Sequence, residues 1–299
     1  MDLNLRIPPR MQTVLDAETD SGVFLEDWPL IEDSLQSVLD NMHKVDFTAR
    51  AVGMIIRGIL SPDPRERKTY FEIARSIAER RVLDRSYLIN ILVEYIVDEI
   101  PHYGIELILM LLNKVGDIES EEIVEIYIPL LTKPLNIKIR KEIIYGITTV
   151  YIYTTMDIIL SSILKHCKQF DSMNSFIAVV IIEICIDGLQ TISKESCSML
   201  ASIFSILLEK ELQATVKKVT ELFNDSAFIY KISRNSDVIV EGLFDTVYQL
   251  SQQYWKTTEQ SFVCEMLQCL FHMNNRVFDE SLRKYNHIKY TKHLEMPKK

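Results

Sequence analysis

The histidines and cysteines of this chain are the residues whose spacing could indicate a metal site. No two of the six histidines form the i, i+4 pair around a glutamate that helical zinc sites use. His166 and Cys167 are neighbours, but adjacent residues on a helix point about 100° apart, so we expect a surface histidine beside a core cysteine. Cys264 and Cys269 are likewise expected to pack. The sequence therefore predicts no metal centre.

Loop signatures of nucleotide-binding and hydrolytic enzymes do not occur in the sequence. The 8 glycines form neither a GxxxxGK[ST] nor a GxGxxG loop, and there is no GxSxG elbow or DDxxD run. Nucleotide binding and isoprenoid chemistry therefore have no local support. A nucleophile, base and acid brought together only in space would leave no such signature. We predict a protein that is not an enzyme and uses no cofactor, with a helical enzyme as an alternative.

The composition indicates a folded, acidic protein. Apolar residues make up 47% of the 299 residues, which is too many for a disordered chain. The 33 Lys and Arg against 42 Asp and Glu give a net charge of −9, so a general nucleic-acid binder, which needs a basic surface, is not expected. Residues from Arg283 onward carry +5 and the rest −14. The acidic body is compatible with docking to basic proteins, or with an ordinary solvated surface.

The cysteines and the N-terminal residues indicate the compartment. Five scattered cysteines do not make a disulfide framework, and an odd number leaves one unpaired, which fits a reducing environment. Residues 1–10 contain Asp2, Arg6 and two prolines in place of an apolar signal core. No run reaches the roughly 18 to 20 apolar residues of a membrane span. We expect a cytoplasmic protein, with the nucleus as a second location and no membrane partner.

Apolar residues recur at helical spacing along almost the whole chain. In the first segment Trp28, Ile31, Leu35 and Met42 lie on one face, and Asp27 is available as a cap. The same pattern predicts helices at residues 48–60, 64–80, 86–100, 105–115, 121–131, 137–153, 156–166, 173–187, 194–208, 212–223, 227–232, 238–255, 259–273 and 276–285. Prolines and glycines separate many of them.

The expected helices form pairs of nearly constant length. The first helices of the early pairs begin near residues 29, 64, 104, 137 and 173, a spacing of 33 to 40 residues. Hairpin turns and strand–helix alternation are not found. We therefore predict an all-α solenoid, or superhelix, of about seven to eight HEAT-like helix pairs that bury their apolar faces against one another. The expected parts are an N-terminal segment (1–26), the solenoid (27–285) and a short basic tail (286–299).

One loop and several other segments resemble a known protein family. Residues 61–67 (SPDPRER) resemble the SEDPRER segment of the B-prime, or B56-type, regulatory subunits of protein phosphatase 2A. Further stretches are similar to that family in the same order: residues 27–29 (DWP), 102–105 (HYGI), 128–130 (IPL), 222–225 (LFND), 229–235 (IYKISRN), 254–258 (YWKTT) and 272–280 (HMNNRVFDE). Ordered agreement is more specific than any single motif. The chain is therefore identified as a divergent, shortened member of this family.

The resemblance implies a function for the predicted solenoid. Members of the family are non-catalytic subunits that bind a scaffold subunit and a metal-dependent catalytic subunit and select substrates for serine/threonine dephosphorylation. Substrate proteins are recognised through short linear motifs. The fold alone would also permit a HEAT or armadillo adaptor, or a transport receptor, unconnected to phosphatase. The ordered motifs favour the phosphatase subunit.

The peptide groove of the family supplies the candidate site residues. It holds peptides of the type Leu-x-x-Ile-x-Glu on the third and fourth repeats, with apolar walls for two side chains and a guanidinium for the acid. By resemblance, Arg85 corresponds to the groove arginine, Arg75 lies at the family's His-Arg pair, and Leu111 and Val115 correspond to the walls. Without the resemblance, Arg85 would be a solvated arginine at a helix end and the two aliphatic residues would be core, and both interpretations stay open.

Overall fold

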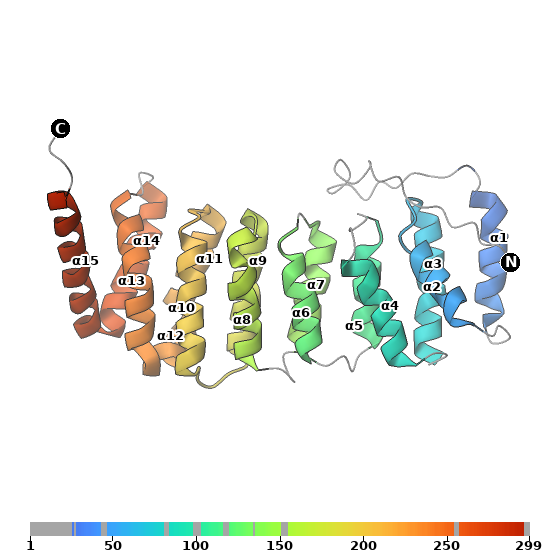
Figure 1. Cartoon of the computed structure of the whole chain (residues 1–299), viewed down its shortest axis with the longest axis horizontal. Helices are drawn as coiled ribbons and strands as arrows, with labels where there is room; N and C mark the ends of the chain where they lie inside the picture. The colour runs from blue at the N-terminus through green and yellow to red at the C-terminus, as the bar shows by residue number, and fades with distance from the viewer. Residues whose placement is uncertain are drawn as a thin grey trace. The chain divides into compact units, whose positions relative to one another are not determined.

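The computed structural model of the chain describes residues 26, 28–42, 47–80, 84–97, 103–115, 120–133, 135–150, 155–253 and 257–295. Every regular element in these residues is a helix, and the helices pack as an all-α solenoid (Figure 1). The predicted fold class is thus confirmed. The chain divides into two compact units: unit 1 is Met1–Leu130 with Pro134–Val150, and unit 2 is Leu131–Lys133 with Tyr151–Lys299.

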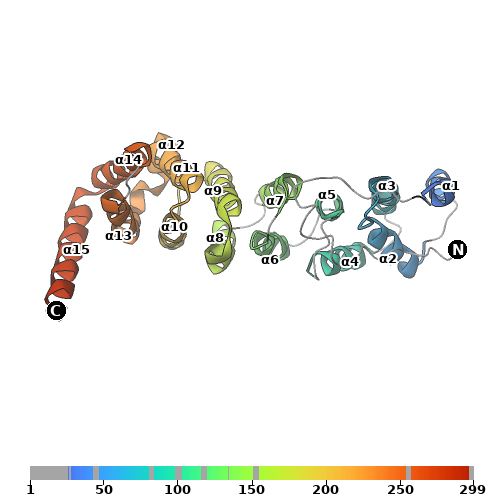
Figure 2. The ribbon, with the colours of Figure 1, turned by 90° about the horizontal axis from the view of Figure 1, so that it is seen from above.

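Unit 1 is built from two layers of helices. In one layer α1, α3, α5 and α7 pack in series, and α2, α4 and α6 form the other (Figure 2). The layers meet through α2 against α3, α4 against α5 and α6 against α7, so each pair buries its apolar face against its neighbours. The helices are α1 (Trp28–Asp40), α2 (Ala49–Gly58), α3 (Pro64–Arg80), α4 (Arg85–Val97), α5 (Ile105–Val115), α6 (Ser120–Leu130) and α7 (Ile137–Val150).

Local sequence explains how such a helix forms, and α2 is an example. The Thr48 hydroxyl accepts a hydrogen bond from the Ala51 N–H at 3.3 Å and caps the first turn. Val52, Ile55 and Ile56 then recur at helical spacing, and all three are buried. The cap therefore sets the start of α2, and the apolar stripe sets the face that packs on α3.

Unit 2 is also built from two layers of helices. In one layer α9 packs on α11 and α11 on α14, while α8, α10, α13 and α15 pack in series in the other. The short α12 interrupts the strict alternation, so that α13 follows α10 in its layer. The helices are α8 (Met156–His166), α9 (Ser172–Asp187), α10 (Lys194–Leu208), α11 (Gln213–Asn224), α12 (Ser226–Ile232), α13 (Ser236–Gln253), α14 (Thr257–Met273) and α15 (Asn275–Glu295), with 3-10 turns at Cys167–Gln169 and Ser233–Asn235.

Polar side chains join segments of unit 2 that lie one helix pair apart in the sequence. The Asn174 side-chain amide donates to the Leu131 carbonyl at 2.9 Å, and the Lys210 ammonium donates to the Cys167 carbonyl at 2.7 Å. In both bonds the donor and acceptor are 43 residues apart. Similar bonds join Asn235 to Ile192 and Lys231 to Ile186, at separations of 43 and 45 residues. These hydrogen bonds of unit 2 thus recur at 43 to 45 residues, slightly more than the 33 to 40 residues between the early helix pairs.

The observed helix bounds agree closely with the predicted ones. The bounds of α3, α5, α8 and α10 are those expected from prolines, caps and apolar spacing. The largest difference is at the last helix, because the helix predicted for residues 276–285 runs from Asn275 to Glu295 as α15. Its sequence contains no glycine or proline, so the charged residues after Tyr285 continue the helix instead of ending it.

The helix predicted for residues 173–187, which contains the apolar segment 176–186, is α9. Ile181, Ile182 and Cys185 are each fully buried. Across the described part of the chain, no helix combines the length and the hydropathy needed to cross a bilayer.

Candidate functional site

The SPDPRER loop between α2 and α3 is held in place by its own side chains. Asp63 is fully buried and accepts hydrogen bonds from the Arg65 backbone N–H at 2.8 Å and from Arg65 Nη2 at 2.7 Å. The Ser61 hydroxyl donates to the Glu66 carboxylate. The Arg65 guanidinium then lies 5.5 Å from the ring centroid of Trp28, within cation–π range. The loop of one family motif thus contacts the tryptophan of another.

Arg67 is buried against the same loop and only 3% of it is exposed. Its Nη1 donates to the carbonyls of Ser61 at 2.9 Å and Pro62 at 3.0 Å. Its guanidinium lies 5.0 Å from the ring centroid of Tyr103. Because a buried guanidinium is costly unless its donors are paired, these contacts fix the side chain and connect the loop to the start of α5.

Gly104 completes this arrangement because its backbone conformation and its surroundings both require glycine. Its φ is +80°, and a Cβ atom there would lie 1.9 Å from the Ile59 carbonyl oxygen. The structure therefore brings together three stretches that carry the family resemblance. We call the set formed by Trp28, residues 61–67, Tyr103 and Gly104 the motif corner.

The two predicted groove arginines lie on consecutive helices. The Arg75 side chain, on α3, is 39% exposed and forms ion pairs with Glu72 and, at 3.7 Å, with Glu79. Arg85 is the first residue of α4, and its side chain lies outside the described residues. A joint role of the two arginines in a peptide groove stays a prediction.

The predicted groove walls, Leu111 and Val115, lie on α5. Helix α5 packs on α3, which carries Arg75. Leu111 is fully buried and Val115 is 8% exposed. Their burial fits the core interpretation that the sequence left open, and their contribution to a groove stays a prediction.

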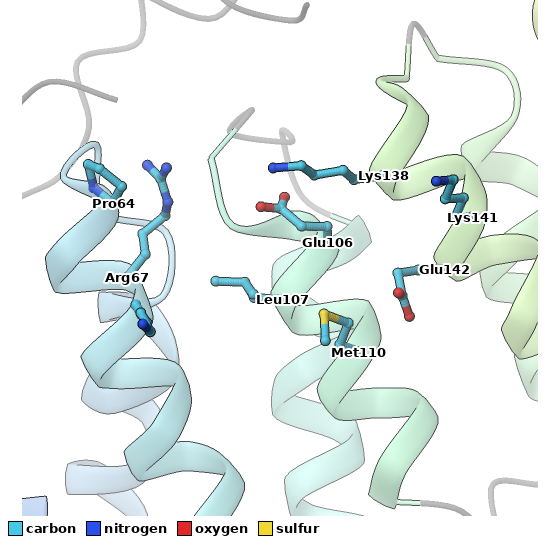
Figure 3. Close-up of a pocket in the computed structure, with 9 residues that line it drawn as sticks. Pro64, Arg67, Glu106, Leu107, Met110, Lys138, Lys141 and Glu142 are labelled. Carbon is cyan, nitrogen blue, oxygen red and sulfur yellow. The ribbon is translucent and has the colours of Figure 1, made fainter. Parts of the chain in front are cut away.

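A surface cavity that sequence reasoning did not indicate adjoins the motif corner. Its volume is about 380 Å³, near the lower end for ligand pockets. Figure 3 shows Leu107 and Met110 of α5 in its centre, between α3 and α7. The lining residues are Pro64, Arg67 and Lys68 of α3, Glu106, Leu107 and Met110 of α5, and Lys138, Lys141 and Glu142 of α7. Three helices contribute, so no spacing within one helix could have revealed the cavity.

A polar network behind the cavity holds Glu142. The Tyr127 hydroxyl donates to Asn113 Oδ1 at 2.7 Å, and Asn113 Nδ2 donates to Glu142 Oε2 at 3.1 Å. Burial raises the pKa of Tyr127 far above its ordinary value, so the phenol stays protonated and remains a donor. At Gly146 a Cβ atom would lie 2.0 Å from the Tyr127 ring. Close packing and paired hydrogen bonds thus fix this wall of the cavity.

The later family motifs lie in unit 2, where they contribute to packing. Phe223, in the LFND stretch, packs edge-on against Phe228 with ring centroids 5.5 Å apart. Asn235, in the IYKISRN stretch, donates to the Ile192 carbonyl at 2.9 Å. Residues 254–256, which include Trp255, lie outside the described residues.

The five cysteines form no disulfide bonds, and Cys167, Cys185 and Cys197 are buried away from solvent. Burial raises the pKa of the Cys185 thiol to about 12 and that of Cys197 to about 11. Cys167 is fully buried, which confirms the predicted core cysteine, whereas its neighbour His166 is half-buried. Among the described residues, no three or more His, Cys, Asp or Glu side chains form a group that could hold a metal ion.

Stacked helix pairs, hydrogen-bonded joints between successive pairs and the motif corner define a helical-repeat protein of the HEAT type. Proteins of this class act by presenting extended surfaces to partners. The family model for the protein phosphatase 2A regulatory B subunit (B56 family) matches residues 5–298, and the chain therefore belongs to this family. The family match confirms the resemblance that the ordered motifs indicated.

A curated relative comes from Schizosaccharomyces pombe. It is the serine/threonine-protein phosphatase 2A 56 kDa regulatory subunit delta 1 isoform, which is 20% identical over 308 residues. The similarity covers 94% of this chain, and the chain spans 56% of the length of that relative.

Proposed function

We propose that this chain is a non-catalytic regulatory subunit of a protein phosphatase 2A holoenzyme. In this role it binds the scaffold subunit and the catalytic subunit and selects substrates. The observation that carries the proposal is the family match over residues 5–298. Similarity to a 56 kDa regulatory subunit supports it. The catalytic chemistry then belongs to the partner, and this chain supplies binding surfaces.

The motif corner accounts for how a divergent chain retains the family fold. Three of its members are buried: Asp63 is 0%, Arg67 3% and Trp28 4% exposed. A buried polar group that loses its partner costs about 1–3 kcal/mol, so these residues depend on one another. We infer that the corner supports partner binding indirectly, by holding α1, α3 and α5 in register.

Substrate selection is proposed to use the α3–α5 surface, with Arg75, Arg85, Leu111 and Val115 as groove residues. In the free chain Arg75 is paired with Glu72 and Glu79. A peptide carboxylate must replace these pairs. Exposed pairs at i, i+3 or i, i+4 contribute only about 0.3–0.5 kcal/mol, so the exchange costs little. A bidentate contact from the guanidinium to the peptide carboxylate would offset it.

Reconstitution from purified components tests assembly. Mixed with scaffold and catalytic subunits, the chain is expected to elute from a size-exclusion column in one early peak that contains all three proteins and phosphatase activity. The S. pombe relative, run in parallel, shows that the other two subunits are competent. Elution of this chain alone, while the relative assembles, would contradict the proposal. A pull-down that recovers a GTPase or cargo without phosphatase would favour the adaptor alternative.

Charge reversal of the groove arginines tests substrate selection separately from assembly. Arg85→Glu is expected to weaken binding of a Leu-x-x-Ile-x-Glu peptide by more than about 1 kcal/mol, because a charge-assisted contact is lost. Arg75→Glu should act in the same direction. Arg276→Glu, at an arginine of α15 that is 82% exposed, is the matched control. Peptide affinity that is unchanged by the first two substitutions would remove both arginines from the groove.

A further inference from the structure

We propose that the cavity between α3, α5 and α7 binds a short acidic segment of a partner protein, which inserts one apolar side chain between flanking carboxylates. The cavity shares no residue with the groove residues Arg75, Arg85, Leu111 and Val115. Its chemistry does not depend on assembly with a phosphatase. It is therefore a second and separate peptide site on unit 1.

The floor of the cavity is apolar and partly open. Leu107 and Met110 are three residues apart on α5, so they lie on one side of the helix, and both are half-buried. Pro64 of α3 adds apolar surface. A methionine adapts to side chains of different shape. A volume of about 380 Å³ accommodates a leucine-sized group with its backbone, whereas a helix with its side chains is about 10–12 Å wide.

The rim of the cavity is cationic. Lys68 of α3 and Lys138 and Lys141 of α7 are exposed. Two carboxylates, Glu106 and Glu142, also line the cavity, and Arg67 lies buried in its wall. The chain as a whole carries a net charge of −9, whereas the side chains around the cavity carry a net positive charge. Complementary charge favours a ligand with carboxylates beside its apolar residue.

The geometry of the helices sets the expected spacing of those carboxylates. Helices in a layer lie about 8–10 Å apart, which places α3 and α7 about 16–20 Å apart on either side of α5. Five extended residues span about 17 Å, and Lys68 of α3 and Lys141 of α7 both line the cavity. Lys68 and Lys141 can therefore meet acidic residues about two positions before and after the inserted side chain.

Glu142 and Arg67, which line the cavity, are held by hydrogen bonds within the protein. Asn113 Nδ2 bonds Glu142 at 3.1 Å, and Arg67 donates to the carbonyls of Ser61 and Pro62. The cavity wall is thus fixed before a ligand arrives, which reduces the entropy lost on binding. A nucleic acid would need a basic stripe along the surface, whereas here the cations surround an apolar floor. This arrangement favours a peptide.

The test uses the full chain and a fluorescein-labelled peptide, Ser-Asp-Glu-Gly-Leu-Gly-Glu-Asp-Ser, with binding followed by anisotropy. The double variant Lys68→Glu/Lys141→Glu is expected to weaken binding at least about tenfold, because two attractions become repulsions. Peptides with Leu replaced by Ser, or with Asp and Glu replaced by Asn and Gln, should each bind more weakly than the parent peptide. Both lysines are exposed, so the variant is expected to fold, which circular dichroism checks.

Matched controls make the result specific. Lys194→Glu/Lys217→Glu carries the same charge change at exposed lysines of unit 2 and is expected to change affinity less than about twofold, since neither lysine lines the cavity. Arg75→Glu should likewise leave this probe bound. The proposal would be overturned if the parent chain did not bind the probe, or if both double variants weakened binding equally. A larger loss of affinity from Arg75→Glu than from Lys68→Glu/Lys141→Glu would also overturn it. So would a single-stranded oligonucleotide that displaces the probe at the same concentration as the unlabelled peptide does.

Discussion

The guanidinium of Arg67 lies 5.0 Å from the ring centroid of Tyr103. The two residues belong to different sequence motifs, one in the first turn of α3 and the other just before α5. Arg67 also donates to the Ser61 carbonyl at 2.9 Å. One buried side chain therefore joins the loop before α3 to the loop before α5, and it fixes the register of two neighbouring helices.

Replacement of Arg67 by methionine is expected to destabilise the protein by about 2–4 kcal/mol, because the carbonyls of Ser61 and Pro62 lose their donor and the ring contact is lost. Urea unfolding followed by circular dichroism measures the change. Arg276→Met is the control: this arginine is exposed and pairs only loosely with Glu280, at 3.8 Å, so a change within about 0.5 kcal/mol is expected. Equal effects of the two substitutions would contradict the role given to Arg67.

Gly104→Ala is expected to destabilise by about 2–5 kcal/mol, because a side chain at positive φ is strained and its Cβ would overlap the Ile59 carbonyl. Gly53→Ala in α2 is the matched control, since nothing lies within 4 Å of a Cβ there. A helical Gly→Ala change of this kind should stabilise by about 0.5–1 kcal/mol. Opposite signs of the two shifts in unfolding midpoint are the expected result, and a tolerated Gly104→Ala would show that the corner is not tightly packed.

Much of the helix pattern could be predicted because its signals are local. Pro64 at the start of α3 and the apolar spacing of α5 and α10 act within one turn or one helix face, and the predicted bounds were correct there. The end of α15 was missed because a charged surface helix has no apolar stripe that distinguishes it from a loop. The sequence also did not show that Gly104 and Gly146 lie where a Cβ would overlap a neighbour.

Lys210→Met is expected to cost about 1–3 kcal/mol, because the carbonyls of Cys167 and Phe170, each 2.7 Å from the ammonium, lose their donor. The loss should be a local one, and hydrogen exchange near the end of α8 should rise before that of α13. Lys217→Met, at a lysine 57% exposed, is the control and should leave exchange in α8 unchanged. If exchange became faster uniformly over unit 2, the Lys210 hydrogen bonds would not act as a local link between successive repeats.

The thiols predict a pattern of chemical labelling. Burial raises the pKa of Cys185 from its ordinary value of 9.0 to about 12, so the folded chain keeps this thiol protonated and unreactive at pH 8. Iodoacetamide should therefore modify the half-exposed Cys264 and Cys269 before Cys185 and Cys197, as measured by mass spectrometry of peptides. Early modification of Cys185 in the native chain would contradict its burial.

The raised pKa of Cys185 also predicts how the stability of the fold depends on pH. The unfolded chain releases the Cys185 proton near pH 9.0, whereas the folded chain retains it to about pH 12. The contribution of this group to stability is therefore fully present below pH 9.0 and is lost as the pH rises towards 12. Cys185→Ala should flatten the decline in unfolding midpoint over this window, and an unaltered slope would show that other groups cause it.

The candidate site was less predictable than the fold because its parts come from separate helices. The contact of Arg65 with Trp28 and that of Arg67 with Tyr103 join motifs that are distant in the sequence, and only the register of the packed helices brings them together. Family resemblance identified the motifs but not their mutual contacts. The cavity around Leu107 has no motif at all, since α3, α5 and α7 each supply only one wall.

Binding to the phosphatase core tests the central claim most directly. A purified complex of scaffold and catalytic subunits is immobilised, and binding of this chain is measured by interferometry with and without excess S. pombe relative. Because both chains belong to one family, we predict saturable binding that the relative suppresses by occupying the same surface. Absence of binding on a surface where the relative binds, or binding that the relative does not reduce, would contradict the assignment as a regulatory subunit.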